Sequence, residues 1–212
     1  MRIKSTAIKG LAAAALVALS ATACSSASST DASKPVAQIP ALSGQATAVA
    51  LDAGFLSALT TLKLTPGTIG TATLADGSLS FPITGGNVTY YTPYSRVPYV
   101  TGDIEHKGSG LSLTAGSTKV ELTNFDIDPG TSKLYGDVTV NGASAATHAY
   151  LFNLDGSTLK PLQTGADGTA ILEGTRVLIS PDAATVLDKV FATDAVKAGL
   201  LVGIAKITVN TK

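Results

Sequence analysis

The sequence predicts a mainly β fold, an antiparallel β-sandwich or open barrel with two short helices. Three observations predict it. Only 14% of the 212 residues are charged, whereas 21 are glycine and Thr, Ser and Val are abundant, a composition typical of an extracellular β domain. Many short stretches alternate apolar and polar residues and are separated by Gly, Asn and Asp turns. Two further stretches carry apolar residues at helical spacing.

The N-terminal residues have the features of a secretory signal peptide. Three basic residues stand in the first nine positions, an apolar run covers residues 11–19, and small residues precede Cys24. The apolar run is too short to span a bilayer. We therefore expect residues 1–23 to be a signal peptide, and the mature chain, which loses the three basic residues, to be mildly acidic.

The cysteine of the chain, Cys24, directly follows Ala-Thr-Ala, and this arrangement resembles the lipobox of bacterial lipoproteins. The resemblance implies that Cys24 carries a diacylglycerol group and further acyl chains, which together form a stable anchor. Residues 24–44 are rich in Ser, Ala and Pro, and we expect them to form a lipidated flexible linker. The protein would then lie on the extracytoplasmic face of the cell membrane; the alternative is a secreted protein with an incidental cysteine.

We expect a single β-sandwich domain over residues 45–212. It begins with a strand at 48–51, after which Asp52 has the position of an N-cap for a short helix whose apolar stripe starts at Phe55. A strand at 68–74 follows this helix.

The C-terminal part of the chain has the same order of elements. A strand is expected at 176–179, and Ser180-Pro181 then forms a cap with proline at the first helical position. The helix covers 183–191, and the last strand covers 201–209.

Eight short strands are expected between these two units. They cover residues 78–83, 88–91, 99–105, 111–113, 119–125, 133–140, 148–154 and 170–172. Turns are expected at residues 85–87, 108–110, 128–130, 141–142 and 155–156. In the strand at 119–125, strict alternation puts Val120, Leu122 and Asn124 on one face and Phe125 on the other.

Residue counts exclude several functions. The 15 basic and 15 acidic residues balance, so the chain lacks the basic surplus of a nucleic-acid-binding protein. A single cysteine excludes an internal disulfide and a multi-cysteine metal site. The two histidines, His106 and His148, are not accompanied by a Gly-x-Ser-x-Gly motif. We therefore expect no catalytic residues and no metal site, and an envelope hydrolase acting through a histidine is a second alternative.

The most distinctive segment is the tyrosine-rich stretch at residues 87–110. Tyrosines next to prolines provide a rigid amphipathic contact surface. A tyrosinate can also ligate ferric haem, with histidine and arginine in support. The alternative is that these tyrosines are ordinary half-buried strand residues. The candidate ligand-binding residues are Tyr90, Tyr91, Tyr94, Arg96, Tyr99 and His106.

A family resemblance rests on three segments: LSFPITGG at 79–86, GDIEHKGSGL at 102–111 and VELTNFDID at 120–128. Together they resemble a family of actinobacterial secreted or lipid-anchored β proteins, which implies fold and location. More distantly, the segment around His106 is similar to the HtaA haem-uptake domain, a β-rich surface module in which a tyrosine ligates haem and a histidine assists. This resemblance implies that His106 assists and that one of the four tyrosines is the ligand.

The sequence thus predicts a lipid-anchored envelope protein with a non-catalytic binding or structural β module and an unidentified envelope ligand or protein partner. The alternative function is a haem-binding module of an HtaA-like iron-uptake system, with haem as its ligand.

Overall fold

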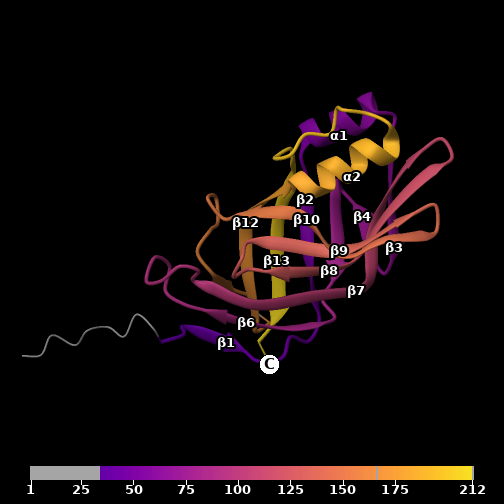
Figure 1. Ribbon diagram of the computed structural model, residues 1–212. Coiled ribbons are helices and arrows are strands. Elements are labelled where there is room, and N and C mark those ends of the chain that lie inside the picture. The colour runs from indigo at the N-terminus through magenta and orange to yellow at the C-terminus, as the bar shows by residue number, and fades with distance from the viewer. Residues whose placement is uncertain (1–33, 166, 212) are drawn as a thin grey trace, which may run out of the picture. The chain divides into compact units, whose positions relative to one another are not determined.

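The computed structural model describes residues 34–165 and 167–211, and it confirms the mainly β fold with antiparallel strands and two helices (Figure 1). The helices are α1 (Ala53–Thr61) and α2 (Pro181–Phe191). The strands are β1 (Ala37–Ile39), β2 (Gln45–Leu51), β3 (Thr65–Gly70), β4 (Thr73–Ala75), β5 (Ser78–Pro82), β6 (Gly85–Tyr90), β7 (Val100–Ala115), β8 (Thr118–Asp128), β9 (Lys133–Val140), β10 (Ala143–Asp155), β11 (Gln163–Thr164), β12 (Thr169–Ile179) and β13 (Leu201–Asn210).

The described strands form one continuous antiparallel sheet, which is the open-barrel form of the expected fold. Its order is β1-β6-β7-β8-β9-β10-β12-β13-β2-β5-β4, with β11 paired to β12 and β3 paired to β7. The sheet curls, so that β7 to β10 face β12, β13 and β2 across an apolar interior (Figure 1).

The two helices have the caps that the sequence predicts. Asp52 accepts hydrogen bonds from the amides of Gly54 and Phe55, and Ser180 accepts one from the amide of Ala183. Both helices lie together at one end of the molecule, whereas β1 and β6 lie at the other (Figure 1). Neither helix in the described part of the chain is long and apolar enough to cross a membrane.

Two of the expected turns are wrong, because their glycines lie inside strands. Gly85 and Gly86 pair with Glu105 and Ile104 in the ladder between β6 and β7. Gly108 interrupts the pairing of β7 with β8, where the register shifts between His106 and Gly110. A φ of +75° at Gly108 permits a bulge at this point, so β7 continues through the segment.

The expected placement of Phe125 on the face opposite Val120 and Leu122 is also wrong, since all three are buried. Asn124 has a φ of +54°, and the register between β8 and β9 shifts at this point. This bulge breaks the alternation, so Asn124 is exposed and Phe125 is buried at 3% exposure. The Asn124 side chain accepts a hydrogen bond from the Gly108 amide at 2.9 Å, which links the bulges of the two neighbouring strands.

The folded part begins within the segment expected to be a linker. β1 pairs with β6, with Ala37 opposite Tyr90 and Ile39 opposite Val88. Cys24 and the expected signal peptide lie outside the described residues.

We predict that Gly110→Ala destabilises the domain by about 1–3 kcal/mol, because the new Cβ would overlap the carbonyl oxygen of Leu122 in the neighbouring strand. The matched control is Gly156→Ala, whose Cβ would meet no atom within 4 Å. Urea denaturation should leave the control within about 0.5 kcal/mol of the wild type. Equal free energies of unfolding for the two variants would contradict the close packing of β7 on β8.

Candidate ligand-binding site

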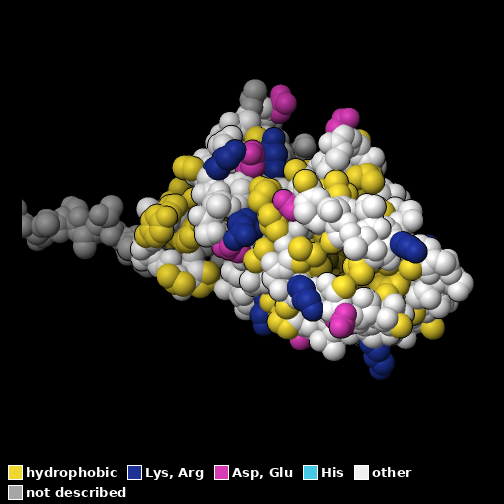
Figure 2. Space-filling view, turned by 90° about the horizontal axis from the view of Figure 1, so that it is seen from above, with side chains coloured by type: hydrophobic (Ala, Val, Ile, Leu, Met, Phe, Trp, Pro, Cys, Tyr) yellow, Lys and Arg dark blue, Asp and Glu magenta, His cyan; other side chains and the backbone are white. Residues whose placement is uncertain are grey.

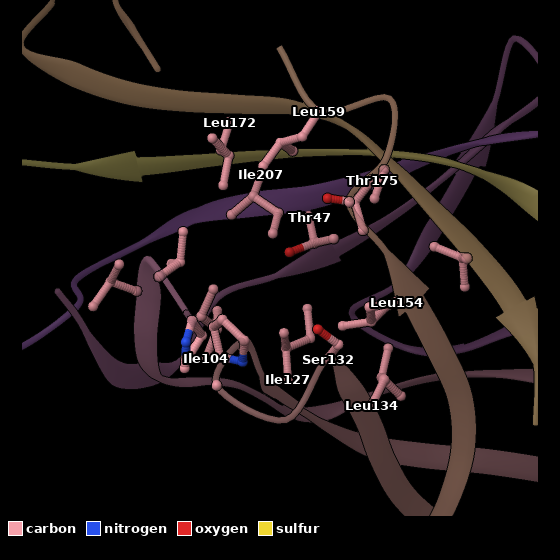
Figure 3. Close-up of a pocket in the computed structure, with 18 of the residues that line it drawn as sticks. Thr47, Ile104, Ile127, Ser132, Leu134, Leu154, Leu159, Leu172, Thr175 and Ile207 are labelled. Carbon is pink, nitrogen blue, oxygen red and sulfur yellow. The ribbon is translucent and has the colours of Figure 1, made fainter. Parts of the chain in front are cut away.

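The interior of the curled sheet contains a cavity of about 480 Å³ (Figure 3). Its walls come from facing parts of the sheet: Leu172 and Ile207 lie on one side, and Ile104 and Ile127 lie on the other (Figure 3). The volume and the predominantly apolar lining are those of a small-molecule site. This cavity is therefore the candidate functional site.

One polar pair lies among these apolar walls. His106 on β7 and Thr47 on β2 both line the cavity, and both are buried, at 1% and 4% exposure. Their side chains form a hydrogen bond of 2.8 Å between Nε2 and Oγ1. Because β7 and β2 are far apart in the strand order, this bond spans the interior of the sheet.

The surroundings of His106 define its protonation state. Nδ1 lies 3.3 Å from the carbonyl oxygen of Phe125, which can only accept, so Nδ1 carries the proton. Nε2 is then the acceptor for the Thr47 hydroxyl. Burial lowers the pKa of His106 to about 4 despite the opposing hydrogen bonds, so the imidazole is neutral near pH 7.

The mouth of the cavity lies at the loop between β6 and β7, residues 91–99. Tyr94, Arg96, Val97, Pro98 and Tyr99 contribute to its lining. Residues 129–132, between β8 and β9, and residues of the loop between β10 and β11 also contribute to the lining. Polar and apolar side chains of three loops thus line part of an otherwise apolar chamber.

The tyrosines at the mouth contact one another. The rings of Tyr90 and Tyr99 meet edge to face at 6.0 Å between centroids, and those of Tyr94 and Tyr99 lie 6.5 Å apart. Burial raises the pKa of Tyr90, and a hydrogen bond from the Leu162 backbone partly offsets this. Burial also raises the pKa of Tyr99. Both phenols are protonated near pH 7 unless a cation binds them.

The cavity brings together five of the six candidate residues named from the sequence: Tyr90, Tyr94, Arg96, Tyr99 and His106. Tyr91 is not part of the lining. Its ring lies under the Arg96 guanidinium, with 4.2 Å from Cζ to the ring centroid. Tyr91 thus contacts a lining residue and does not itself face the chamber.

The sequence does not identify Thr47 or the aliphatic wall residues as parts of a site. Thr47 lies in a strand-like stretch of small residues, and nothing in that stretch points to a partner 59 positions away. The inward aliphatic residues have the same alternating pattern whether they fill a core or surround a cavity.

The second histidine lies on β10 and is not among the cavity-lining residues. Its ring stacks on Tyr135 at 4.5 Å, and Nδ1 lies 3.8 Å from Oδ2 of Asp126. Among the described residues, neither imidazole is hydrogen-bonded to a serine hydroxyl. The geometry around His106 and His148 therefore gives no support to the hydrolase alternative.

A carboxyl pair lies on the neighbouring strands β7 and β8. A hydrogen bond with Asp126, together with desolvation and the charge of Asp126, raises the pKa of Asp103 to about 6. Oδ1 of Asp126 is buried and has no hydrogen-bond partner among the described residues. Neither residue is part of the cavity lining.

Comparisons with known proteins identify the fold. No family model and no curated protein matches the sequence. The structure is similar to the crystal structure of the C-terminal domain of HtaA from Corynebacterium glutamicum, with a TM-score of 0.55, 15% sequence identity, and coverage of 80% of this chain and 97% of that one. A domain-swapped dimer of a histidine-to-alanine variant of that domain matches with a TM-score of 0.48 and 16% identity, over 74% of this chain and 91% of that one. The fold is thus that of the HtaA C-terminal domain, as the sequence resemblance implied.

We predict that His106 makes the stability fall in acid. Its pKa is 6.5 in the unfolded chain and about 4 in the folded one, so only the unfolded chain gains a proton between these values. The contribution of His106 to the free energy of unfolding is complete above pH 6.5. About 3 kcal/mol of this free energy is lost as the pH falls to 4.

Asp103 has the opposite effect on stability over the same pH range. Its pKa is raised in the fold, so the folded chain takes up a proton before the unfolded chain does, and the folded state is favoured as the pH falls through about 6. The measurement therefore uses urea denaturation of Asp103→Asn and of Asp103→Asn/His106→Gln between about pH 4 and pH 7. We expect the free energy of unfolding of the first variant to fall by about 3 kcal/mol more than that of the second as the pH falls to 4. Parallel profiles would contradict a buried neutral imidazole.

Proposed function

We propose that this domain is a non-catalytic binding module that takes haem into the cavity between the facing strands. The observation that carries the proposal is an apolar cavity of about 480 Å³ whose lining includes three tyrosines and an arginine. The structural similarity to the C-terminal domain of HtaA supports it. Haem uptake therefore becomes the preferred function, ahead of a module for an unidentified envelope ligand.

The residues around the cavity fit the chemistry of haem. When bound, haem supplies a ferric centre that accepts a phenolate ligand, together with two negatively charged propionates. The aliphatic walls would contact the porphyrin, and Arg96 at the rim would pair with a propionate. Tyr90, Tyr94 and Tyr99 each contribute to the lining near Arg96 and are the candidate ligands.

Tyr90 is the preferred ligand among these three tyrosines. It ends β6, its side chain is buried, and its ring packs edge to face on the ring of Tyr99. A side chain on a strand is held in a more precise position than a side chain on a loop. Tyr94, by contrast, is 95% exposed on the loop.

His106 has a positioning role in this proposal. Both of its ring nitrogens are engaged, Nδ1 with Phe125 and Nε2 with Thr47, so the imidazole holds β7 against β8 and β2. The walls on either side of the ligand are thereby kept at a fixed separation. A neutral imidazole also adds no charge to an apolar chamber.

We predict that haemin added to the purified domain produces a Soret band with a tyrosinate signature, and that Tyr90→Phe weakens haemin binding by at least about tenfold. Tyr99→Phe and Tyr94→Phe are measured in parallel. Tyr91→Phe is the matched control, because Tyr91 lies on the same loop outside the lining, and it should bind as the wild type does.

Metal-free protoporphyrin IX separates iron ligation from general apolar binding. It should bind the wild type and Tyr90→Phe equally, because it lacks the ferric ion that a phenolate would ligate. Absence of a Soret change in the wild type would refute haem binding. Equal loss of haemin and protoporphyrin in Tyr90→Phe would refute iron ligation by Tyr90.

The proposed location of the protein is the extracytoplasmic face of the cell membrane, with Cys24 as the lipid anchor. The support is the sequence pattern around Cys24. We predict that mass spectrometry of the mature N-terminus finds an acylated Cys24 and that Cys24→Ser abolishes the acylation. An unmodified mature chain starting elsewhere would contradict the anchor.

A further inference from the structure

We propose that the rim of the cavity around the loop at residues 91–99 docks directly onto the surface of a lipid bilayer, so that the cavity opens towards the membrane. This contact is separate from any covalent anchor and does not depend on the identity of the ligand. It assigns a membrane-binding surface to the folded domain itself.

The first observation is the exposure of apolar side chains at this rim. Among the described residues, the two most exposed large hydrophobic side chains are Tyr94 and Val97, each at 95%. Val36, which is 60% exposed, lies next to the start of the same loop, because its amide donates to the carbonyl of Tyr90 at 2.8 Å. Hydrophobic side chains also gather at the β1 end of the molecule in the space-filling view (Figure 2). Exposed apolar groups concentrated in one place indicate an interaction surface.

The second observation is the chemistry of the same rim. Tyrosine is enriched at membrane–water interfaces, where its ring lies among headgroups, and arginine extends its charged end to lipid phosphates. The rim supplies both in Tyr94 and Arg96. Two described stretches at this rim, residues 34–39 and 88–102, contain no Asp or Glu and carry Lys34 and Arg96. These two stretches therefore present positive charge to an anionic lipid surface.

The third observation identifies the bilayer as the occupant rather than a protein. The described chain begins beside this rim, and Cys24 precedes Val36 by only 12 residues, at most about 40 Å of extended chain. If Cys24 carries the proposed lipid, the rim is the part of the domain that is tethered closest to the membrane. The helices, with exposed Leu56 and Val186, lie at the opposite end (Figure 1).

This orientation has a consequence for ligand exchange. An apolar ligand could pass between the bilayer and the chamber beside Tyr94 and Val97 without crossing bulk water. The loop at residues 91–99 would then be both the membrane contact and one wall of the entrance.

Single tryptophans test the contact, because the chain contains no natural tryptophan. Residues 32–212 form one compact unit that contains every described strand pair, so this part is used without lipid or haemin, after its cooperative unfolding has been verified. Val97→Trp is compared with Val186→Trp on α2, a matched change at the other end. Vesicles contain equal parts of phosphatidylcholine and phosphatidylglycerol.

We expect vesicles to shift the Val97→Trp emission to shorter wavelength and brominated lipid to quench it, with neither effect on Val186→Trp. Tyr94→Ser/Val97→Ser should lower the vesicle-bound fraction by at least about tenfold, whereas Leu56→Ser/Val186→Ser should leave it unchanged. Arg96→Gln should weaken binding to the mixed vesicles and not to pure phosphatidylcholine.

Equal responses of the two tryptophans, or no vesicle binding, would overturn the proposal. An emission shift of Val97→Trp that depends on protein concentration without vesicles would overturn it in favour of a contact between two copies. Because these experiments contain no haemin, a negative result would refute membrane docking and would not bear on haem binding.

Discussion

The hydrogen bond between His106 and Thr47 joins β7 to β2 across the interior of the curled sheet, and the candidate site depends on it. These strands are not neighbours in the strand order, but residues 83 and 84 link their backbones, since the amide of Ile83 donates to Gln45 on β2 and the amide of Thr84 donates to Glu105 on β7. The buried side-chain pair adds a second link inside the chamber, and burial keeps the imidazole neutral among apolar groups although its hydrogen bonds oppose this. The chamber can thus remain open while its walls are held in place.

Two bulges in neighbouring strands make this bond possible. The left-handed conformation of Asn124 turns Phe125 inward, where its ring meets Phe81 at 5.1 Å and its carbonyl accepts from His106. The bulge at Gly108 lies in the same region of β7, two residues after His106, and is linked to Asn124 by a hydrogen bond. Local irregularity in the backbone is therefore the origin of the site's geometry.

Much of this fold could be predicted from its sequence, and the failures have a common physical cause. Alternation predicted most strands, and Asp52 and Ser180 marked both helix starts correctly, because capping and pleating are local effects. The glycines at 85–86 and 108 predict turns but lie in strands, because the positive φ of Gly86 and Gly108 also permits close strand packing or a bulge. The tyrosine cluster could be found from its composition, but the cavity depends on long-range pairing that leaves no local signal.

The central claim is that haem enters the chamber between the facing strands, and methyl NMR with ferric haemin tests it most directly. Isoleucine methyl groups report both on the chamber and on the rest of the domain. Ile104, Ile127 and Ile207 line the chamber, whereas Ile69 and Ile179 do not. The account predicts that the paramagnetic iron shifts or broadens the first three signals and leaves the other two sharp. Unchanged signals from Ile104, Ile127 and Ile207 in a haemin-bound sample would contradict it.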